Sequence, residues 1–552
     1  MQIKTLKIHS NDNVVVALTT LYKSEVVHTQ NNSKIILEEN IPAKHKFTIK
    51  DFQQGDEIIM YGVLVGRSTK FIKKGALITT QNIQHATNSY QLKDRKTQWH
   101  KPDISKWQSK TFMGYYRADG SVGTRNYWII IPLVFCENKN IDVLQEAFMK
   151  ALGYQPKQSP YEAMVQRFVQ QYQSGKMQTE ILSADITVDE MEEKHKKIFQ
   201  NVDGIKFLTH TMGCGGTRDD ARALCGLLAG YITHSNVAGA TVLSLGCQNA
   251  QISLLKEEIE KRNKKFSKPL FLLEQQKIGS EKKLLEEAIK KTFSGLITAN
   301  KIEREPAPLS KLCIGLECGG SDGFSGISAN PAIGFTSDLL VALGGSVILS
   351  EFPELCGVEQ ELSDRCINDE TANRFMQLMN IYNERAMQAG SGFYANPSPG
   401  NIKDGLITDA IKSAGAAKKG GTSPVTDVLD YPEKATKQGL NLLCTPGSDV
   451  ESTTAEVGAG ANIILFTTGL GTPTGNPVAP VLKLSTNTTL YNKMHDIIDI
   501  DTGTIIEGTE TIEQVGERIF DYIIQVANGE LKAKAEELQH DDFIPWKRGI
   551  SL

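Results

Sequence analysis

From Gly114 onward, short apolar runs alternate with charged, amphipathic runs, and this alternation limits the fold more than any other feature of the sequence. The apolar runs have the length of strands and occupy residues 127–132, 204–209, 241–245, 312–316, 346–350 and 463–467. The charged runs have helical composition and occupy residues 257–265, 281–291, 370–388 and 515–528. Alternation of this kind favours parallel sheets covered by helices, so this part of the chain is predicted to be α/β.

The rest of the chain divides into shorter regions. Residues 1–85 carry short strand-like segments separated by Gly, Pro and Asp turns, which predicts a small all-β domain. Residues 86–112 are polar and without apolar periodicity, as is typical of a linker. The 552 residues are too many for one core. A break near Glu303-Arg-Glu-Pro-Ala-Pro308 divides the remainder into a middle α/β domain, residues 113–300, and a C-terminal domain, residues 301–552.

Composition excludes several classes of protein. A hydrophobic content of 40% and a charged content of 22% are those of an ordinary soluble protein. The net charge of −4 provides no polyanion-binding footprint, so no nucleic acid partner is expected. No apolar run reaches the ~18 residues that span a bilayer, and the N-terminus lacks a signal peptide, so no membrane contact and a cytoplasmic location are expected. The nine cysteines follow no repeating framework and are predicted to be reduced thiols, available as buried hydrophobes or metal ligands.

The segment Glu317-Cys-Gly-Gly-Ser-Asp-Gly-Phe-Ser-Gly326 directly follows an apolar run. Four glycines in ten residues cost backbone entropy, which a close approach of the backbone to a ligand would offset. Cys318, Ser321 and Asp322 stand among these glycines and carry groups able to bind a metal, donate a hydrogen bond or move a proton. The carboxyl ends of strands are where α/β proteins bind their ligands, so this loop is predicted to belong to an active site.

Three further turns follow apolar runs and carry reactive side chains. Residues 208–217 include His210 and Cys214, residues 243–249 include Cys247, and residues 348–354 include Glu351. A single cysteine there would be read as a small buried hydrophobe, but three in the same setting suggest convergence on one metal site. The spacing is not Cys-x-x-Cys, which argues against a closed zinc site. An open site of thiolate, imidazole and carboxylate ligands suits Fe(II) better.

Other motifs suit an anionic, hydroxylated ligand. Arg117 and Arg125 flank a turn from which guanidinium groups can hold a carboxylate bidentately; the alternative is that Arg117 pairs with Asp119 to fix the turn. Asn396 begins a rigid turn rich in hydrogen-bonding groups. Lys483 lies within a strand-like run, where a buried amine is costly unless functional; the alternative is an edge lysine that reaches solvent.

Motifs for nucleotide-dependent and α/β-hydrolase chemistry are missing or incomplete. No Gly-x-Gly-x-x-Gly opens a helix after a first strand, and no Walker A loop occurs. Gly319-Gly-Ser-Asp-Gly323 matches Gly-x-Ser-x-Gly, but Gly326 and Pro331 follow at once, where a nucleophile elbow would need a helix. Both chemistries are therefore disfavoured.

Taken in order, these motifs resemble the altronate and galactarate dehydratase family of sugar-acid dehydratases. The matching segments run from residue 114 to about 505 and comprise 114–127, 210–215, 236–247, 318–331, 350–354, 396–401, 419–422, 445–447, 466–469 and 483–487. Residues 1–85 resemble the SAF (β-clip) domain that precedes the catalytic part in these enzymes, a match that includes His45. Where relatives commonly end this domain with His-x-His-Asn, this chain has Thr79-Thr-Gln-Asn82, so no role of those histidines is carried over.

The resemblance implies a homodimer with a β-clip domain, a linker, a dimerising middle domain and a Rossmann-like C-terminal domain. It implies a hydro-lyase that depends on Fe(2+), with Mn(2+) or another divalent metal as the alternative. The expected reaction converts D-altronate to 2-keto-3-deoxy-D-gluconate and water. The alternatives are a galactarate dehydratase or a sulfolactate sulfo-lyase of the same family, or, in a different class, a non-catalytic carbohydrate-binding protein.

Roles for the singled-out residues follow from this reading. Cys214, Cys247 and Cys318, with His210 or Glu351, are expected to hold the metal, and Asp322 or Glu351 to serve as the base. His210 is also a catalytic candidate. The residues expected to contact the substrate are Arg117, Arg125, Ser321, Asn396, Lys483 and His45.

Overall fold

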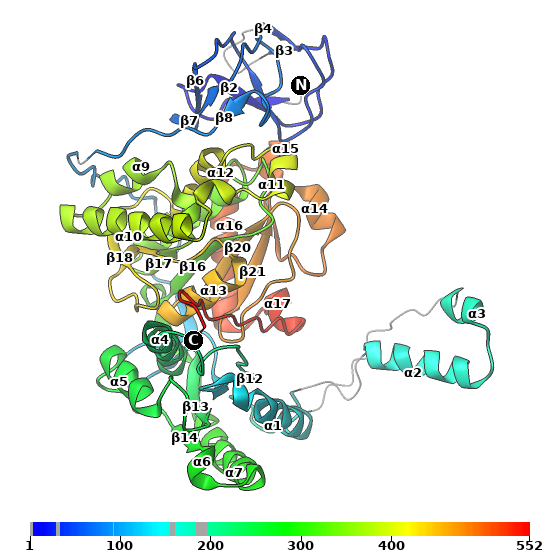
Figure 1. The fold of residues 1–552 in the computed structure, drawn as a ribbon, viewed down its shortest axis with the longest axis vertical. Helices are drawn as coiled ribbons and strands as arrows, with labels where there is room; N and C mark the ends of the chain where they lie inside the picture. Colours follow the sequence, from blue (N-terminus) through cyan, green and yellow to red (C-terminus); the bar gives the residue numbers. More distant parts are fainter. Residues whose placement is uncertain (1–3, 29–33, 92, 155–159, 184–195, 552) are drawn as a thin grey trace.

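The computed structural model describes residues 4–28, 34–91, 93–154, 160–183 and 196–551. Residues 1–3 and 29–33 of the predicted N-terminal domain and residue 92 of the predicted linker lie outside this part. Figure 1 shows the N-terminal strands at one end of the molecule, the C-terminal α/β unit in the centre and residues 111–300 at the other end. Among the described residues, no helix is both long enough and apolar enough to cross a membrane.

The N-terminal domain, which we call the SAF domain after the β-clip domain it resembles, consists of short strands. They form the sheets β1-β2-β5, β3-β4 and β6-β7-β8. Their bounds are β1 Thr5–Leu6, β2 Val14–Ala17, β3 Val26–His28, β4 Lys34–Ile36, β5 Lys46–Thr48, β6 Glu57–Met60, β7 Val63–Ser68 and β8 Ile83–Gln84. Successive side chains of β2 point to opposite faces: Val15 and Ala17 join the domain's own core, whereas Val14 and Val16 join the large core shared with the C-terminal domain. Both faces of β2 are therefore buried.

Residues 111–308 contain a small antiparallel sheet and a parallel one. The antiparallel sheet β10-β9-β15 pairs β9 Thr111–Tyr116 with β10 Val122–Gly123 and β15 Glu305–Pro308. The parallel sheet has the order β12-β11-β13-β14. Its strands and the helices of this region are β11 Tyr127–Pro132, η1 Phe135–Glu137, α1 Asn138–Ala151, α2 Pro160–Gln173, α3 Gln178–Ser183, β12 Gly204–Phe207, α4 Arg218–Thr233, β13 Val237–Ser244, α5 Ile252–Arg262, β14 Leu270–Glu274, α6 Gln275–Ile278 and α7 Glu281–Ala299.

The C-terminal unit is built on seven parallel strands in the order β18-β19-β17-β16-β20-β21-β22. The strands are β16 Cys313–Cys318, β17 Ser346–Leu349, β18 Val425–Leu429, β19 Gly439–Leu443, β20 Ile463–Thr468, β21 Val481–Ser485 and β22 Ile500–Asp501. From β16 the chain runs to β17 and then to the edge strand β18 before it returns to β19, and β20 lies on the other side of β16, so the switch point of this doubly wound sheet lies between β16 and β20. The predicted α/β architecture is thus confirmed.

Helices cover both faces of this sheet (Figure 1). Their bounds are η2 Leu309–Lys311, α8 Ala329–Ala342, η3 Phe352–Leu355, α9 Glu359–Asp364, α10 Asp369–Gln388, η4 Phe393–Ala395, α11 Pro399–Lys403, α12 Asp409–Ala416, η5 Ala417–Gly420, α13 Asp449–Ala459, α14 Thr488–Lys493, α15 Thr504–Glu507, α16 Ile512–Asn528 and α17 Lys534–Glu537. Side-chain caps fix several of the starts: Asn368 accepts from the Thr371 amide before α10, and Thr511 forms a capping box before α16.

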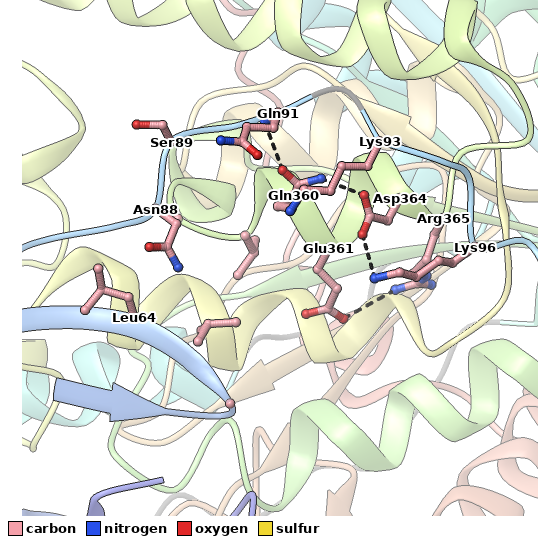
Figure 2. Close-up of a pocket in the computed structure, with 14 residues that line it drawn as sticks. Leu64, Asn88, Ser89, Gln91, Lys93, Lys96, Gln360, Glu361, Asp364 and Arg365 are labelled. Atoms are coloured by element: carbon pink, nitrogen blue, oxygen red, sulfur yellow. Dashed lines mark hydrogen bonds and ion pairs between the residues drawn. The ribbon is translucent and has the colours of Figure 1, made fainter. Parts of the chain in front are cut away.

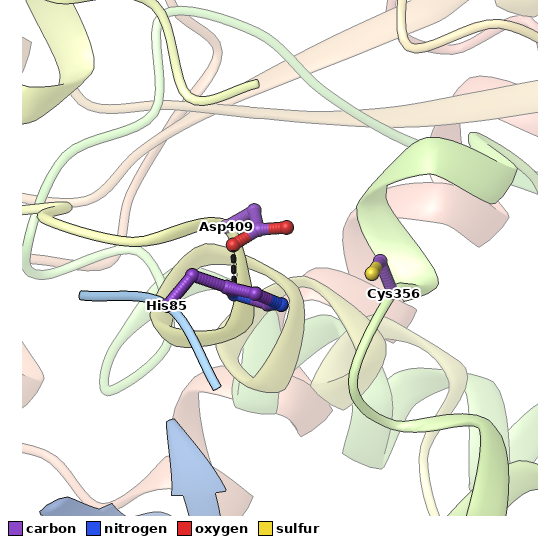
Figure 3. A group of neighbouring side chains, drawn as sticks. All are labelled: His85, Cys356 and Asp409. Atoms are coloured by element: carbon purple, nitrogen blue, oxygen red, sulfur yellow. Dashed lines mark ion pairs between the residues drawn. The ribbon is translucent and has the colours of Figure 1, made fainter. Parts of the chain in front are cut away.

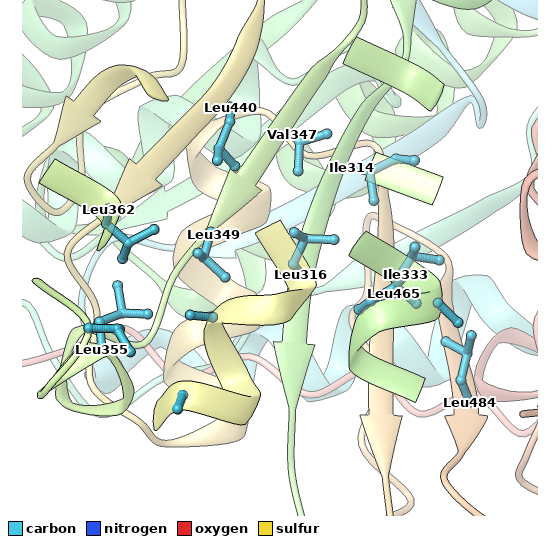
Figure 4. Close-up of a cluster of buried hydrophobic side chains, with 14 of the residues drawn as sticks. Ile314, Leu316, Ile333, Val347, Leu349, Leu355, Leu362, Leu440, Leu465 and Leu484 are labelled. Carbon is cyan, nitrogen blue, oxygen red and sulfur yellow. The ribbon is translucent and has the colours of Figure 1, made fainter. Parts of the chain in front are cut away.

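Apolar side chains join these layers into continuous cores. Leu316, Val347 and Leu465 from adjacent central strands pack beneath the covering helices (Figure 4). A second cluster joins α4 and the middle sheet to α13 and the back of the seven-stranded sheet. There Gly230 on α4 permits close contact, because a Cβ at this position would lie 2.2 Å from the Gly458 carbonyl oxygen. The active-site candidates therefore stand on a rigid, continuously packed base.

Candidate active site

The carboxyl ends of β16, β17 and β20 form one edge of the seven-stranded sheet, on both sides of its switch point. Cys318 is the last residue of β16, Glu351 follows β17 by two residues, and Thr468 ends β20. Ligands of doubly wound sheets bind outside the carboxyl ends of the strands at such a point.

Three potential metal ligands meet there. The Cys318 sulfur and carboxylate oxygens of Glu351 and Glu354 all lie within 4.8 Å of one another, and the three residues are buried. We call these three residues the thiol–carboxylate cluster. Two lysines contact it: Lys419 Nζ lies 3.0 Å from the Cys318 sulfur and 2.5 Å from Glu351 Oε2, and Lys412 Nζ lies 2.5 Å from Glu354 Oε1. The positive charges of the two lysines offset those of the buried carboxylates.

Glu351 has two features that are unusual for a buried residue. Its φ of 62° lies in the left-handed region, a conformation that is costly for a residue with a Cβ and that concentrates at functional sites. Its Oε2 atom contacts Lys419, whereas its Oε1 atom is buried and accepts no lysine, amide or hydroxyl hydrogen bond from the described residues. The neighbouring Glu317 carboxyl is within hydrogen-bonding range of Glu351, and burial together with the charge of Glu351 raises its pKa well above its usual range. A protonated Glu317 can therefore donate to Glu351, and a bound ion would have to replace that proton.

Further acidic groups surround the cluster, and burial together with the charges of the cluster raises their pKa values. Burial, followed by the charges of Glu351 and Glu354, raises the pKa of Asp449 to about 7. Burial raises the pKa of Glu456 to about 8, and burial together with Glu351 raises that of Glu317 well above its usual range. Carboxyls with a pKa near neutrality are suited to proton transfer at physiological pH. Asp449 is half-buried, whereas Glu317 and Glu456 are fully enclosed.

Asp322 lies beside the cluster in the glycine-rich loop, with both carboxylate oxygens occupied. Oδ1 accepts from the Phe324 amide at 3.0 Å and from the Ser325 hydroxyl at 3.2 Å. Oδ2 accepts from the Thr486 hydroxyl at 3.1 Å and pairs with Lys44 Nζ of the SAF domain at 2.9 Å. These contacts hold Asp322 as an anchor between the two domains and leave it no free oxygen with which to take a proton.

The SAF turn that carries Lys44 and His45 packs directly on two glycines of the C-terminal domain. A Cβ at Gly323 would lie 2.3 Å from the Lys44 carbonyl oxygen, and one at Gly405 would lie 2.5 Å from the same atom. His45 itself is half-buried, with Nδ1 3.2 Å from the Ala43 carbonyl oxygen. Glycine is required at both positions because any side chain would push the turn away.

Two other predicted substrate contacts line the same region. Asn396 donates to Glu354 Oε1 at 3.1 Å and accepts from Lys412 at 2.8 Å. The Ser321 hydroxyl is buried and has no hydrogen-bond partner among the described residues. Asn396 and Asp449, which interact with the cluster, are half-buried rather than fully enclosed.

The structure separates the predicted metal ligands. Cys318 and Glu351 belong to the cluster, whereas Cys214 and Cys247 are exposed, and among the described residues the three sulfurs do not lie within 4.8 Å of one another. Cys214 and Cys247 follow β12 and β13 of the other parallel sheet and are neighbours of Cys136, which follows β11. The structure therefore places the three cysteines at the carboxyl edges of two different sheets, and which of them bind a metal stays a prediction.

His210 lies buried in the turn after β12. Its Nε2 lies 2.7 Å from the Pro132 carbonyl oxygen, and its Nδ1 accepts from the Met212 amide at 3.1 Å. Burial lowers the pKa of this imidazole to about 4, so it stays neutral. Both ring nitrogens hold the turn after β12 in this structure, and the catalytic or metal-binding role of His210 stays a prediction.

The predicted carboxylate-binding cations are also engaged elsewhere. Arg125 forms a bidentate pair with Glu536 at 2.7 and 2.8 Å and donates to two backbone carbonyls. Arg117 donates to the Ser235 carbonyl and the Asn126 side chain at 2.7 and 2.9 Å. Lys483 is buried and donates to the Thr474 carbonyl at 2.9 Å; burial lowers its pKa to about 8. None of the three contacts the thiol–carboxylate cluster, so their contacts are those of structural residues.

Sequence reasoning overlooked the two lysines and Asp449 as site residues. Lys412 and Lys419 lie 58 and 68 residues from their carboxylate partners, so no local spacing marks them. The segment Lys419-Gly-Gly-Thr422 was one of the motifs behind the resemblance, and this was the one sequence signal for Lys419.

A separate cavity of about 650 Å³ opens between the linker, β7 and α9 (Figure 2). Two linker residues bind α9 at this cavity. The Gln91 amide donates to the Gln360 side chain, and Lys96 pairs with Asp364 at 2.9 Å. Its lining includes neither Cys318 nor Glu351, so it is distinct from the cluster.

Three family models match successive parts of the chain. Residues 3–86 match the altronate/galactarate dehydratase SAF domain, residues 114–300 the D-galactarate dehydratase/altronate hydrolase second domain, and residues 309–551 the D-galactarate/altronate dehydratase C-terminal domain. Among curated proteins, the chain is 34% identical to an altronate dehydratase of Bacillus subtilis strain 168 and 32% identical to one of Escherichia coli strain K12, in each case over 99% of both chains. It is 31% identical to an E. coli K12 galactarate dehydratase (L-threo-forming), over 96% of this chain and 94% of the relative.

Proposed function

This chain belongs to the D-galactarate/altronate dehydratase family, and from that premise we propose that it dehydrates D-altronate to 2-keto-3-deoxy-D-gluconate at the thiol–carboxylate cluster. Family membership makes it a hydro-lyase for a sugar acid. The observation that carries the proposal is the meeting of Cys318, Glu351 and Glu354, flanked by two lysines, at the switch point of the sheet. A carbohydrate-binding protein would have no need for this costly buried arrangement.

The reaction removes a proton from C2, next to the carboxylate, and a hydroxyl from C3. The electron pair left by the C2 proton forms the C2–C3 double bond, and the C3 hydroxyl leaves as water once it has received a proton. The resulting enol then becomes the 2-keto acid. The difficult step is the first, because negative charge accumulates on the carboxylate oxygens as the proton departs.

The cluster fits a divalent metal. It provides one sulfur and two carboxylate donors within 4.8 Å of one another. A soft thiolate beside carboxylates suits Fe(2+), with Mn(2+) as the alternative. Such an ion, when bound, supplies Lewis-acid stabilisation of the charge that builds on the substrate carboxylate.

Two residues near the cluster are candidates for the base and for the group that assists the leaving hydroxyl. Asp449, with a pKa of about 7 and partial access to solvent, is our candidate for the base that takes the C2 proton. Burial by itself would lower the pKa of Lys412, but the nearby charges, that of Glu354 foremost, outweigh burial and raise this pKa. This ammonium therefore stays protonated beside Asn396. Lys412 is therefore our candidate for orienting the leaving hydroxyl and donating a hydrogen bond to it.

The SAF domain contributes Lys44 and His45 at the same edge. Lys44 bridges Asp322 and Asp404 at 2.9 and 3.5 Å, and the unpartnered hydroxyl of Ser321 lies one residue from Asp322. We propose that this turn closes over the substrate and excludes water from the cluster. The D-altronate preference rests on the two altronate dehydratases that match over the full chain.

An anaerobic assay tests the proposal. Full-length protein with Fe(2+) is offered D-altronate, galactarate and other aldonic and aldaric acids, and sulfolactate, while 2-keto acid and sulfite are measured. D-altronate should give the highest kcat/KM, and Glu351→Gln should lose at least a hundredfold. Turnover confined to galactarate or sulfolactate would replace the proposed substrate, and binding without any turnover would refute the proposed chemistry.

We also propose a homodimer joined through α2 and α3. This arm projects from the rest of the molecule (Figure 1) and exposes large apolar side chains, including Tyr161, Tyr172 and Leu182 at 71%, 75% and 75%. Exposed apolar groups at this density are typical of interfaces. Light scattering should give twice the chain mass, and Tyr172→Asp should give the monomer, while Tyr22→Asp on the SAF domain should not.

A further inference from the structure

A second group of metal-ligating side chains lies where the SAF domain ends. His85 directly follows β8, Cys356 follows η3 and Asp409 is the first residue of α12. One ligand atom of each lies within 4.8 Å of the other two. Figure 3 shows the His85 imidazole against the Asp409 carboxylate, with Cys356 facing them from the other side. The group thus joins two domains that are distant in the sequence.

These side chains contact one another. His85 Nδ1 and Asp409 Oδ1 form an ion pair, and Asp409 is also within hydrogen-bonding range of the Cys356 thiol. Glu359 adds a second carboxylate that interacts electrostatically with all three; its Oε2 accepts from the Gly357 amide at 2.7 Å. One imidazole, one thiol and two carboxylates therefore share a small volume.

The charges in this group are poorly balanced. Among the residues the structure describes, no lysine or arginine forms an ion pair or hydrogen bond with His85, Cys356, Glu359 or Asp409. The thiol–carboxylate cluster differs in this respect, because lysines neutralise its carboxylates. Asp409 is buried, and only a titratable imidazole and the start of α12 offset its charge. A bound cation would complete the balance.

We propose that His85, Cys356 and Asp409 bind a divalent metal ion of the zinc class, which fastens the end of the SAF domain to α12. Nitrogen, sulfur and oxygen donors are those of tetrahedral zinc sites, where metal–ligand distances of about 2.0–2.3 Å place ligand atoms about 3.3–3.8 Å apart. The three ligand atoms lie within 4.8 Å of one another, so small side-chain movements would bring them to that spacing. Binding releases the thiol proton to solvent, and Glu359 or a water molecule completes the coordination.

The site would act on the position of the SAF domain. Helix α12 also carries Lys412, which contacts Glu354, so the ion would fix the SAF domain to the same helix that supports the thiol–carboxylate cluster. The inference does not depend on the proposed substrate, because it concerns metal binding and domain attachment alone.

Metal stoichiometry tests the inference. Chelator-treated full-length protein is titrated with Co²⁺ as a spectroscopic probe, and bound metal is counted after gel filtration. His85→Gln and Cys356→Ser should each bind one equivalent less than the parent, and Cys356→Ser should reduce the thiolate–cobalt charge-transfer absorption. The controls His28→Gln and Cys313→Ser, which change the same residue types elsewhere, should bind as the parent does.

Domain attachment provides the second readout. Zn²⁺ should slow proteolysis within the linker of the parent at least fivefold and should not do so for His85→Gln. The proposal is overturned if the parent and His85→Gln bind the same amount of metal and are equally protected from proteolysis. It is also overturned if the control variants lose as much bound metal as His85→Gln does. If Cys356→Ser fails to fold, His85→Gln still decides, since the His85 side chain is one-third exposed.

Discussion

Arg125→Met is expected to lower the free energy of unfolding rather than to weaken substrate binding. The sequence predicts that Arg125 binds the substrate, whereas the structure engages it in a buried ion pair. The guanidinium forms a bidentate pair with Glu536 at 2.7 and 2.8 Å and donates to the Thr124 and Val526 carbonyls, both at 2.8 Å. Both side chains of the pair are at most 10% exposed. Methionine keeps much of the volume but leaves the Glu536 carboxylate buried without its cation.

The magnitude follows from that burial. Removing one partner of a buried ion pair costs about 3–5 kcal/mol, which is roughly a hundredfold to several-thousandfold in the unfolding equilibrium. Denaturant unfolding followed by tryptophan fluorescence reports the change, because Trp107 and Trp128 are fully buried in the folded protein and become exposed on unfolding. The double variant Arg125→Met/Glu536→Leu should regain part of the loss, since no unpaired charge then remains. The KM for the sugar acid should stay within about twofold in the folded enzyme.

Arg222→Met is the matched control. Arg222 pairs with Glu257 and Glu258 on the surface with its side chain 55% exposed, so the loss should stay below about 1 kcal/mol. The reasoning is refuted if Arg125→Met leaves stability unchanged and raises KM tenfold or more. That result would return Arg125 to the substrate-binding role expected from the sequence.

Three further predictions concern the site and its docking surface. Cys318→Ser should lower bound iron and turnover together, and full activity with unchanged iron would contradict its role as a ligand. The raised pKa of Asp449 means that the folded state holds this proton more tightly than the unfolded state, so its contribution to stability falls as pH rises from about 4 to 7. Asp449→Asn should flatten that fall by about 2 kcal/mol between pH 5.5 and 7.5 in urea unfolding, whereas equal slopes would refute the assignment. Gly405→Ala should displace the Lys44 turn, raise KM and speed linker proteolysis. Gly390→Ala shares the positive φ but has no atom within 4 Å of the new Cβ, so similar effects in both variants would exclude the contact as the cause.

Much of the local structure could be predicted from the sequence. Each of the six strand-like runs predicted after Gly114 overlaps a strand, and residues 127–132 coincide with β11. Such runs can be recognised in the sequence because central parallel strands are buried on both faces and are therefore continuously apolar. Every residue of β13 and β20 is buried. The glycine-rich loop was also recognisable, since its glycines leave room for neighbouring groups: a Cβ at Gly319 would lie 2.0 Å from the Asp449 carboxylate.

The membership of the site was harder to predict. The structure brings Cys318, Glu351 and Asn396 into one cluster and places Cys214 on another sheet. All the candidate loops look alike in sequence, because each follows an apolar strand and most contain glycine. His210 is a further example. A histidine in such a loop suggests proton transfer or metal binding, but in the structure two backbone contacts use both of its ring nitrogens.

By itself, the sequence determined the fold class, the order of strands and helices, and the loops that carry reactive groups, because burial patterns and turn residues act over a few neighbouring positions. Only the tertiary structure decided which loops meet. The order of strands in the two sheets sends Cys318 and Cys214 to different edges, and chain closure over 68 residues places Lys419 against Glu351. Pairing of buried charges depends on distance in space and on shared burial, neither of which is visible in residue spacing.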